Sequence, residues 1–386
     1  MKKRLLSIVL VFVLLGSLSV YADTTAASTA PPLRLTLEEA QKMALENSVT
    51  YQSQDSYIRN ALDTYDDTVD KTNKKSISKN LMTYFSSTIN NDISVENAAN
   101  AVTSARLQKE NVRRSSDLNV KNSFLNIKKA QYSLDDAKNN VVLKQKDLDS
   151  AKIKCTLGYI TKDNLKTYEK AYTDAVSDQD TALKNLQQEL QTLNKYLGRE
   201  LTDYNIELVM DLTPVNISDI NLDIIREAYI KNSSSIYTVE QKLEIAKRTY
   251  ELTQERYDNL KQKGTDTFKQ DMKDAVTDAE RNYNTAKSDY DDVIKKLNID
   301  LDSSYNSLKT LSEAIDKLNR DIADYKKDLS KAAVQYDLGL ISKVDYEKKE
   351  IGLTTMQNKL NSTIADQNMT YANMTLYVDN VETASK

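Results

Sequence analysis

The chain has 386 residues with 53 basic and 57 acidic side chains, a net charge of −4 and no histidine. Without histidine it lacks the commonest metal ligand and the usual general base near neutral pH, and the single Cys155 excludes internal disulfides and cysteine zinc sites. The slightly negative charge gives no electrostatic basis for binding nucleic acid. We therefore predict a protein that is not an enzyme, holds no metal or cofactor and does not bind nucleic acid.

Residues 1–22 have the organisation of a secretory signal peptide. Three basic residues at positions 2–4 precede an apolar run, and Ala22 supplies the small residue at the predicted cleavage site. The alternative is an uncleaved N-terminal anchor, although the run is short for a membrane span. We predict an exported protein in which residues 23–34, rich in Thr, Ala, Ser and Pro, form a flexible leader.

The first helix is predicted to begin after Thr36, which can act as N-cap, with Glu39 at the spacing of a capping box. It ends near Asn47-Ser48, where a second helix starts, and the same order recurs around Asn232-Ser233. Pro214 lies between the two sets. We predict a helical repeat 1 at residues 35–213 and a helical repeat 2 at residues 214–386.

Within each repeat a connection leads to a very long helix. In repeat 1 we expect an irregular connection over residues 71–94, whose apolar patch, 81–89, either caps the hairpin end or contacts lipid or a partner; in repeat 2 we expect a turn near Gly264. Residues 94–157 and 267–337 then carry apolar side chains at steps of three and four, which predicts coiled-coil helices. Neither connection has the alternating runs expected of membrane strands.

Two short stretches, 157–164 and 338–345, read as a helix end followed at once by a new helix start. Gly158 and Gly339 can adopt the left-handed conformation that ends a helix, and Thr161 and Ser342 can cap the next one. Returning helices are predicted at 162–197 and 343–378. These stretches are therefore the tips of two helical hairpins.

The tips show that the chain is duplicated. They lie at a fixed offset, 339 − 158 = 181, and eight of 17 positions are identical when residues 146–162 are compared with 327–343. The identical pairs are Lys146/Lys327, Asp147/Asp328, Leu148/Leu329, Ala151/Ala332, Leu157/Leu338, Gly158/Gly339, Ile160/Ile341 and Lys162/Lys343. We predict an all-α, elongated fold of duplicated long-helix coiled-coil hairpins.

A duplicated unit of this kind, opened by Leu-Thr-Leu-Glu-Glu-Ala at residues 35–40, resembles the TolC outer-membrane efflux family over residues 35–379. The resemblance implies a TolC-like α-barrel protomer and a homotrimer whose long helices form a tunnel. It also implies that an adaptor protein of the periplasmic type docks at the tips and links the tunnel to an inner-membrane pump. The tip residues that correspond by position are Gly158, Tyr159, Ile160, Thr161, Gly339, Leu340, Ile341 and Ser342. Asp163 and Asp345 are candidate entrance acids, which a trimer would gather into a ring, although helix capping alone explains Asp345 equally well.

The chain departs from the family in lacking clear β-barrel strands between the second and third helices of each repeat. The resemblance implies an outer-membrane location, but membrane spanning stays open. Two functions remain: a trimeric helical conduit or docking component of an efflux or type I-like export system, or an exported coiled-coil scaffold or surface-interaction protein without transport activity.

Three further features have more than one interpretation each. The acidic groups at residues 63–70 and 289–292 could bind Ca²⁺ or line a cation-selective tunnel, but they lack EF-hand spacing and are more typical of solvated helix faces. Cys155 is either a small packed side chain or a reactive thiol.

Overall fold

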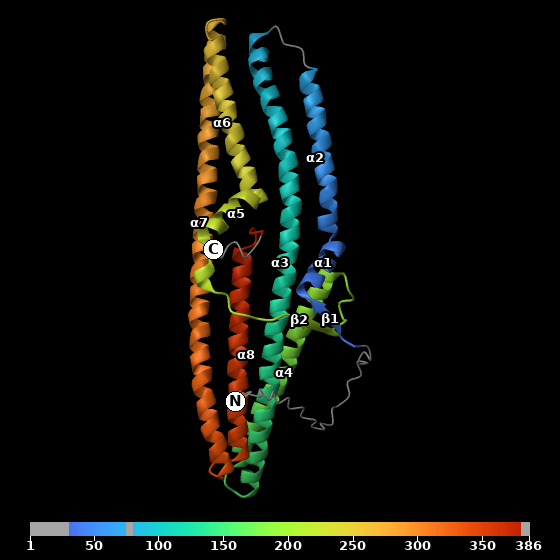
Figure 1. Cartoon of the computed structure of the whole chain (residues 1–386), viewed down its shortest axis with the longest axis vertical. Helices are drawn as coiled ribbons and strands as arrows, with labels where there is room; N and C mark the ends of the chain where they lie inside the picture. The colour runs from blue at the N-terminus through green and yellow to red at the C-terminus, as the bar shows by residue number, and fades with distance from the viewer. Residues whose placement is uncertain (1–30, 75–79, 380–386) are drawn as a thin grey trace, which may run out of the picture.

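The computed structural model describes residues 31–74 and 80–379, so the predicted signal peptide and residues 23–30 of the leader lie outside the described residues. This part of the chain is an elongated array of long helices (Figure 1). The predicted all-α, elongated fold is confirmed. Its helices are α1 (Leu37–Asn47), α2 (Val49–Asn73), α3 (Leu81–Thr156), α4 (Lys162–Leu197), α5 (Leu222–Asn232), α6 (Ser234–Leu260), α7 (Asp266–Asp337) and α8 (Lys343–Met374).

The helices form two sets of four whose lengths follow the same order. They have 11, 25, 76 and 36 residues in α1–α4, and 11, 27, 72 and 32 residues in α5–α8. At about 1.5 Å per residue, α3 and α7 are roughly 114 and 108 Å long. Single serines, Ser48 and Ser233, separate the first two helices of each set and cap the second, as the sequence predicts. The structure therefore has the duplication seen in the sequence.

The predicted irregular connection at residues 71–94 is wrong over most of its length. Helix α2 continues to Asn73 and α3 begins at Leu81, with the Asn80 side chain accepting hydrogen bonds from two backbone N–H groups of the first turn. Phe85 and Ile89 lie one turn apart and are buried against α6 and α7, in a cluster with Leu252, Leu260, Phe268 and Met272. This packing favours helix in a segment whose own propensity is weak. The apolar patch thus caps the hairpin end through Phe85 and Ile89.

An all-α fold is expected from the sequence, but the described residues also contain a short parallel strand pair, β1 (Leu33–Thr36) with β2 (Ile206–Val209). Leu33 lies opposite Ile206, and Leu35 opposite Leu208. Leu35 and Leu208 are buried in the core beneath the pair. Strands of four residues are too short to leave a clear periodic signal in the sequence. Their pairing is also hidden, because the two partners lie at opposite ends of a repeat.

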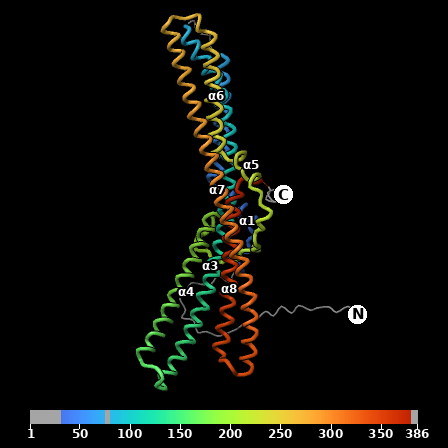
Figure 2. The backbone as a smooth tube through the Cα atoms, turned by 90° about the vertical axis from the view of Figure 1, so that its left-hand side faces the viewer, coloured from blue at the N-terminus to red at the C-terminus, as the bar shows by residue number. Residues whose placement is uncertain are grey.

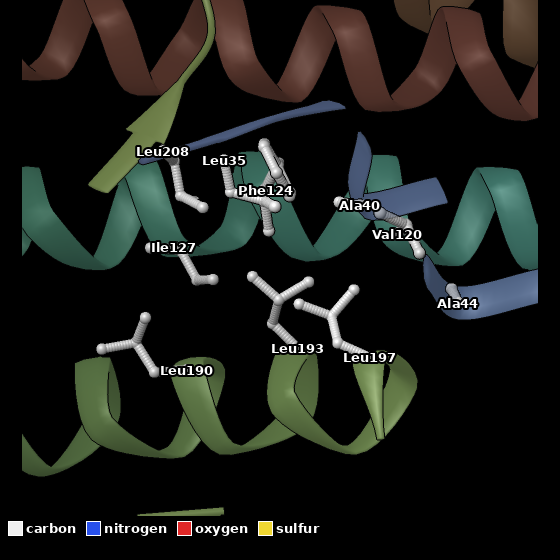
Figure 3. Packing of buried hydrophobic residues seen from close by; sticks show 10 residues of the cluster. All are labelled: Leu35, Ala40, Ala44, Val120, Phe124, Ile127, Leu190, Leu193, Leu197 and Leu208. Atoms are coloured by element: carbon white, nitrogen blue, oxygen red, sulfur yellow. The ribbon is translucent and has the colours of Figure 1, made fainter. Parts of the chain in front are cut away.

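The main core of the first set lies in the midsection of the molecule, where α1 and the two strands meet α3 and α4 (Figure 1), and Figure 3 shows its side chains. Phe124 of α3 and Leu193 of α4 are completely buried, and Ala40 of α1 packs against them together with the two strands. An equivalent core in the second set surrounds Ile225 of α5 and Leu308 of α7. These two cores hold the midsection, from which the hairpins extend in both directions.

Helix α3 joins the two sets. Its Arg114, with a side chain only 7% exposed, forms ion pairs with Glu110 and with Asp379 of the C-terminal segment, and donates to the Leu376 carbonyl. Asn232 donates to the Tyr377 carbonyl at 2.8 Å. These bonds hold residues 376–379 against α3 and α5. Helix α8 ends at Met374, four residues before the predicted end at residue 378.

Among residues 31–74 and 80–379, no helix contains a stretch that is both long and apolar enough to span a bilayer.

Candidate functional site: the paired hairpin tips

The two tips have the same backbone geometry. Gly158 and Gly339 have φ values of +79° and +71°, the left-handed region that side chains with a Cβ rarely adopt. The Gly158 N–H donates to the Cys155 carbonyl at 3.0 Å and the Tyr159 N–H to the Lys154 carbonyl at 2.8 Å, and the second tip repeats both bonds. This is the Schellman arrangement, in which the orphan carbonyls at the helix end are satisfied. The predicted role of both glycines in ending a helix is confirmed.

The next helices begin at the predicted caps. Thr161 accepts from the Asn164 N–H at 3.1 Å, and Ser342 accepts from the Asp345 N–H at 3.1 Å. The Ser342 hydroxyl also donates to the Asp345 carboxylate at 2.7 Å, but this cap has no counterpart of the bond that the Thr36 backbone N–H donates to the Glu39 carboxylate at 2.9 Å. Those Thr36 bonds hold the pKa of Glu39 below its usual value. An aspartate is one methylene shorter than a glutamate, which accounts for the difference.

Large apolar side chains are exposed at both tips. Leu157 and Tyr159 are 63% and 78% exposed at the first tip, and their repeat counterparts Leu338 and Leu340 are 68% and 69% exposed. Ile160 and Ile341 are half-buried beneath them. Exposed apolar side chains gathered at the same place in both repeats are typical of an interaction surface. Both tips lie at the same end of the molecule (Figure 2).

The candidate entrance acids make local interactions. Asp163 pairs with Lys166 at 3.0 Å on its own helix, and Asp345 accepts from Ser342. Their predicted part in an entrance needs several copies of the chain and stays a prediction.

The two tip hairpins are joined by polar contacts between α3 and α8, which were not predicted from the sequence. Lys146 pairs with Glu347, and Lys348 pairs with Asp147 at 2.7 Å. The bond to Asp147 raises the pKa of Lys348 above its ordinary value. Further from the tips, Asn358 donates to Asp135 and Asp136, and Lys129 pairs with Asp366. The identity of Lys146 and Asp147 with Lys327 and Asp328 is a sequence signal that could have drawn attention to these positions.

The remaining candidates do not form a site. Asp67 and Asp70 pair with lysines one turn further along α2, and no group of three or more metal-binding side chains lies together in residues 31–74 and 80–379. Cys155 is half-buried. A cavity of about 450 Å³ between α3, α6 and α7 is lined mainly by apolar and amide side chains, including Asn100, Tyr237 and Ile245.

Solved structures with a similar arrangement of helices include outer-membrane proteins and outer-membrane channels. The outer membrane protein VceC from Vibrio cholerae has a TM-score of 0.63 and 12% identity, covering 88% of this chain and 95% of its own. CusC, described in terms of transmembrane channel formation, has a TM-score of 0.62 and 14% identity over 92% of this chain and 94% of its own. The CmeC outer membrane channel of Campylobacter jejuni has a TM-score of 0.60 and 15% identity over 90% and 85%.

The resemblance to the TolC outer-membrane efflux family that the sequence predicts is therefore confirmed in the fold. No protein-family model matches the sequence, and no curated protein matches it.

Proposed function

We propose that this chain is an exported component of a cell envelope, acting as a trimeric helical conduit or docking component of an efflux or type I-like export system. The observation that carries the proposal is the likeness in fold to outer-membrane channels over about nine-tenths of the chain. The signal-like residues 1–22 support export, and the duplicated, exposed apolar tips support docking of an adaptor that leads to an inner-membrane pump.

In this proposal the long helices form the wall of a passage. Helices α3 and α7, with their returning partners α4 and α8, would line a tunnel, and the tips at one end would meet the adaptor. No chemical step is assigned to any side chain. Localisation in the outer membrane follows from the likeness to the channels and belongs to the same proposal.

The assembly is tested by the mass and shape of the purified protein. We expect light scattering to give the mass of three copies and small-angle scattering to give a tubular particle. A protein that stays an elongated monomer at high concentration and in detergent would contradict the conduit and favour a scaffold without transport activity.

Acidic side chains at the second tip are expected to weaken docking. Leu338→Asp with Leu340→Asp should weaken binding of the adaptor encoded nearest to this gene by at least tenfold, because both leucines are more than two-thirds exposed and would lose apolar contact area. Binding is measured by interferometry with the immobilised adaptor.

The control is Val49→Asp, which changes a side chain that is 77% exposed in the first turn of α2, where an acidic residue is tolerated. It should bind like the parent. Equal loss in both variants, or undiminished binding by the tip variant, would rule out docking through the tips.

A further inference from the structure

A cavity of about 410 Å³ lies in the midsection, where α3 has α1 on one side and the end of α8 on the other (Figure 1). The segment that follows α8, residues 375–379, forms part of its wall. None of the tip residues lines this cavity, so it is separate from the candidate docking surface.

The wall combines positive charge with apolar side chains that come from different elements. Its three cations, Arg113, Arg114 and Lys121, all belong to α3. Three of its apolar side chains, those of Ala372, Leu376 and Val378, come from the end of α8 and the segment after it, and Leu118 of α3 adds a fourth. A cavity of this size, with apolar walls and a few charged groups, is typical of a site for a small organic molecule.

The two acidic side chains of the wall already have partners. Asp117 accepts from Arg113 at 2.7 Å, and Asp379 pairs with Arg114, which is only 7% exposed. Glu110 pairs with both arginines, at 2.5 and 3.2 Å. The charges of the two arginines are therefore balanced by carboxylates of the chain itself.

Lys121 is the cation of the wall that lacks such a balance. Among residues 31–74 and 80–379 its ammonium group has no ion-pair or hydrogen-bond partner, although Asp117 lies one turn earlier on the same helix. The Lys121 side chain is half-buried, and burial lowers the pKa of its ammonium group below the ordinary value. Burial also raises the pKa of Asp117, so the surroundings solvate charged groups poorly. An unpaired charge in such surroundings is costly, and an anion would relieve that cost.

We propose that this cavity binds a small organic monocarboxylate, with its charged group on the Lys121 ammonium and its apolar part against Leu376 and Val378. One unpaired cation suits a single negative charge, and the two arginine pairs stay intact when the anion binds. This inference goes beyond the proposed function and does not depend on assembly or docking.

Calorimetric titration of the purified protein with valerate, at constant ionic strength, tests the site. We expect saturable binding of one valerate per chain. Acetate should bind at least tenfold more weakly, because it lacks most of the apolar part. Valeramide, which has nearly the same shape but no charge, should also bind at least tenfold more weakly, because it cannot neutralise Lys121.

Lys121→Met tests the role of the ammonium group, because it removes the charge and keeps an unbranched side chain. It should weaken valerate binding at least tenfold. Without valerate its Tm should equal or exceed that of the parent, because an unpaired, partly buried charge has been removed. A clear fall in Tm without valerate would show that Lys121 is paired within the chain and would overturn the proposal.

The matched control is Lys138→Met, which removes an exposed lysine from the same helix and should bind valerate like the parent. No saturable binding, equal affinity for valerate and valeramide, or equal loss in both variants would also overturn the site. None of these outcomes bears on the conduit, which is tested separately by the mass and shape of the assembly.

Discussion

Phe124→Ala is expected to lower the free energy of unfolding by about 3–5 kcal/mol, the usual cost of removing a buried aromatic ring from a core. Phe124 is completely buried where α3 meets α4, α1 and the two strands, and Leu193 on α4, also completely buried, belongs to the same cluster (Figure 3). Truncation leaves a cavity that long, regular helices cannot collapse to fill. Urea denaturation followed by circular dichroism measures the loss.

Ile299→Ala is the control for this experiment, because Ile299 is 58% exposed on α7 and its truncation should change stability by no more than about 0.5 kcal/mol. A second variant, Ile225→Ala, opens the equivalent core of the second set. A loss below about 1 kcal/mol for Phe124→Ala would contradict the packing described. Two separate transitions would show that the repeats unfold independently.

Gly198→Ala is expected to lower the free energy of unfolding by about 2–3 kcal/mol, because it combines backbone strain with a steric clash. Gly198 ends α4 with φ +66°, and an added Cβ would lie 2.6 Å from the side chain of Asn47. Asn47 donates to the Leu197 carbonyl at 2.8 Å, so the clash also threatens the bond that joins α1 to the end of α4. Thermal and urea denaturation give the change.

A double-mutant cycle separates the two causes. Asn47→Ala alone loses the bond to Leu197. In the double variant that bond is also lost, but the 2.6 Å clash with the Asn47 side chain disappears, which leaves the lost bond and the strain of a left-handed alanine. The double variant should therefore be less destabilised than the two single changes added together. Additive losses would mean that the clash is relieved by movement elsewhere.

The local features of the fold are readable from the sequence because each depends on a few neighbouring residues. Gly158 and Gly339 mark the tips, Thr36 starts α1 and Ser48 separates two helices, all as predicted. The predicted returning helix at 162–197 has the bounds of α4. The candidate docking residues at the tips come from the same signals, although their function stays a prediction.

The features that depend on distant residues were not predictable in this way. The first turns of α3 are helical because Phe85 and Ile89 pack on α6 and α7, which no local pattern indicates. The strands need each other across a whole repeat, and the pairing of Lys348 with Asp147 needs the arrangement of α3 beside α8. The ion pairs between α3 and α8 can be predicted only when it is known that these two helices are neighbours.

The strand pair has a consequence for the order in which the chain folds. Strand β1 can pair only with β2, and the opposed residues Leu33 and Ile206 are 206 − 33 = 173 residues apart in the sequence. A chain that emerges N-terminus first, from a ribosome or a translocation channel, can form α2, α3 and α4 before that strand is paired. Closing such a long loop is slow, so residues 33–36 expose an open edge until the crossover arrives. The first element of the described chain is therefore among the last to find its partner.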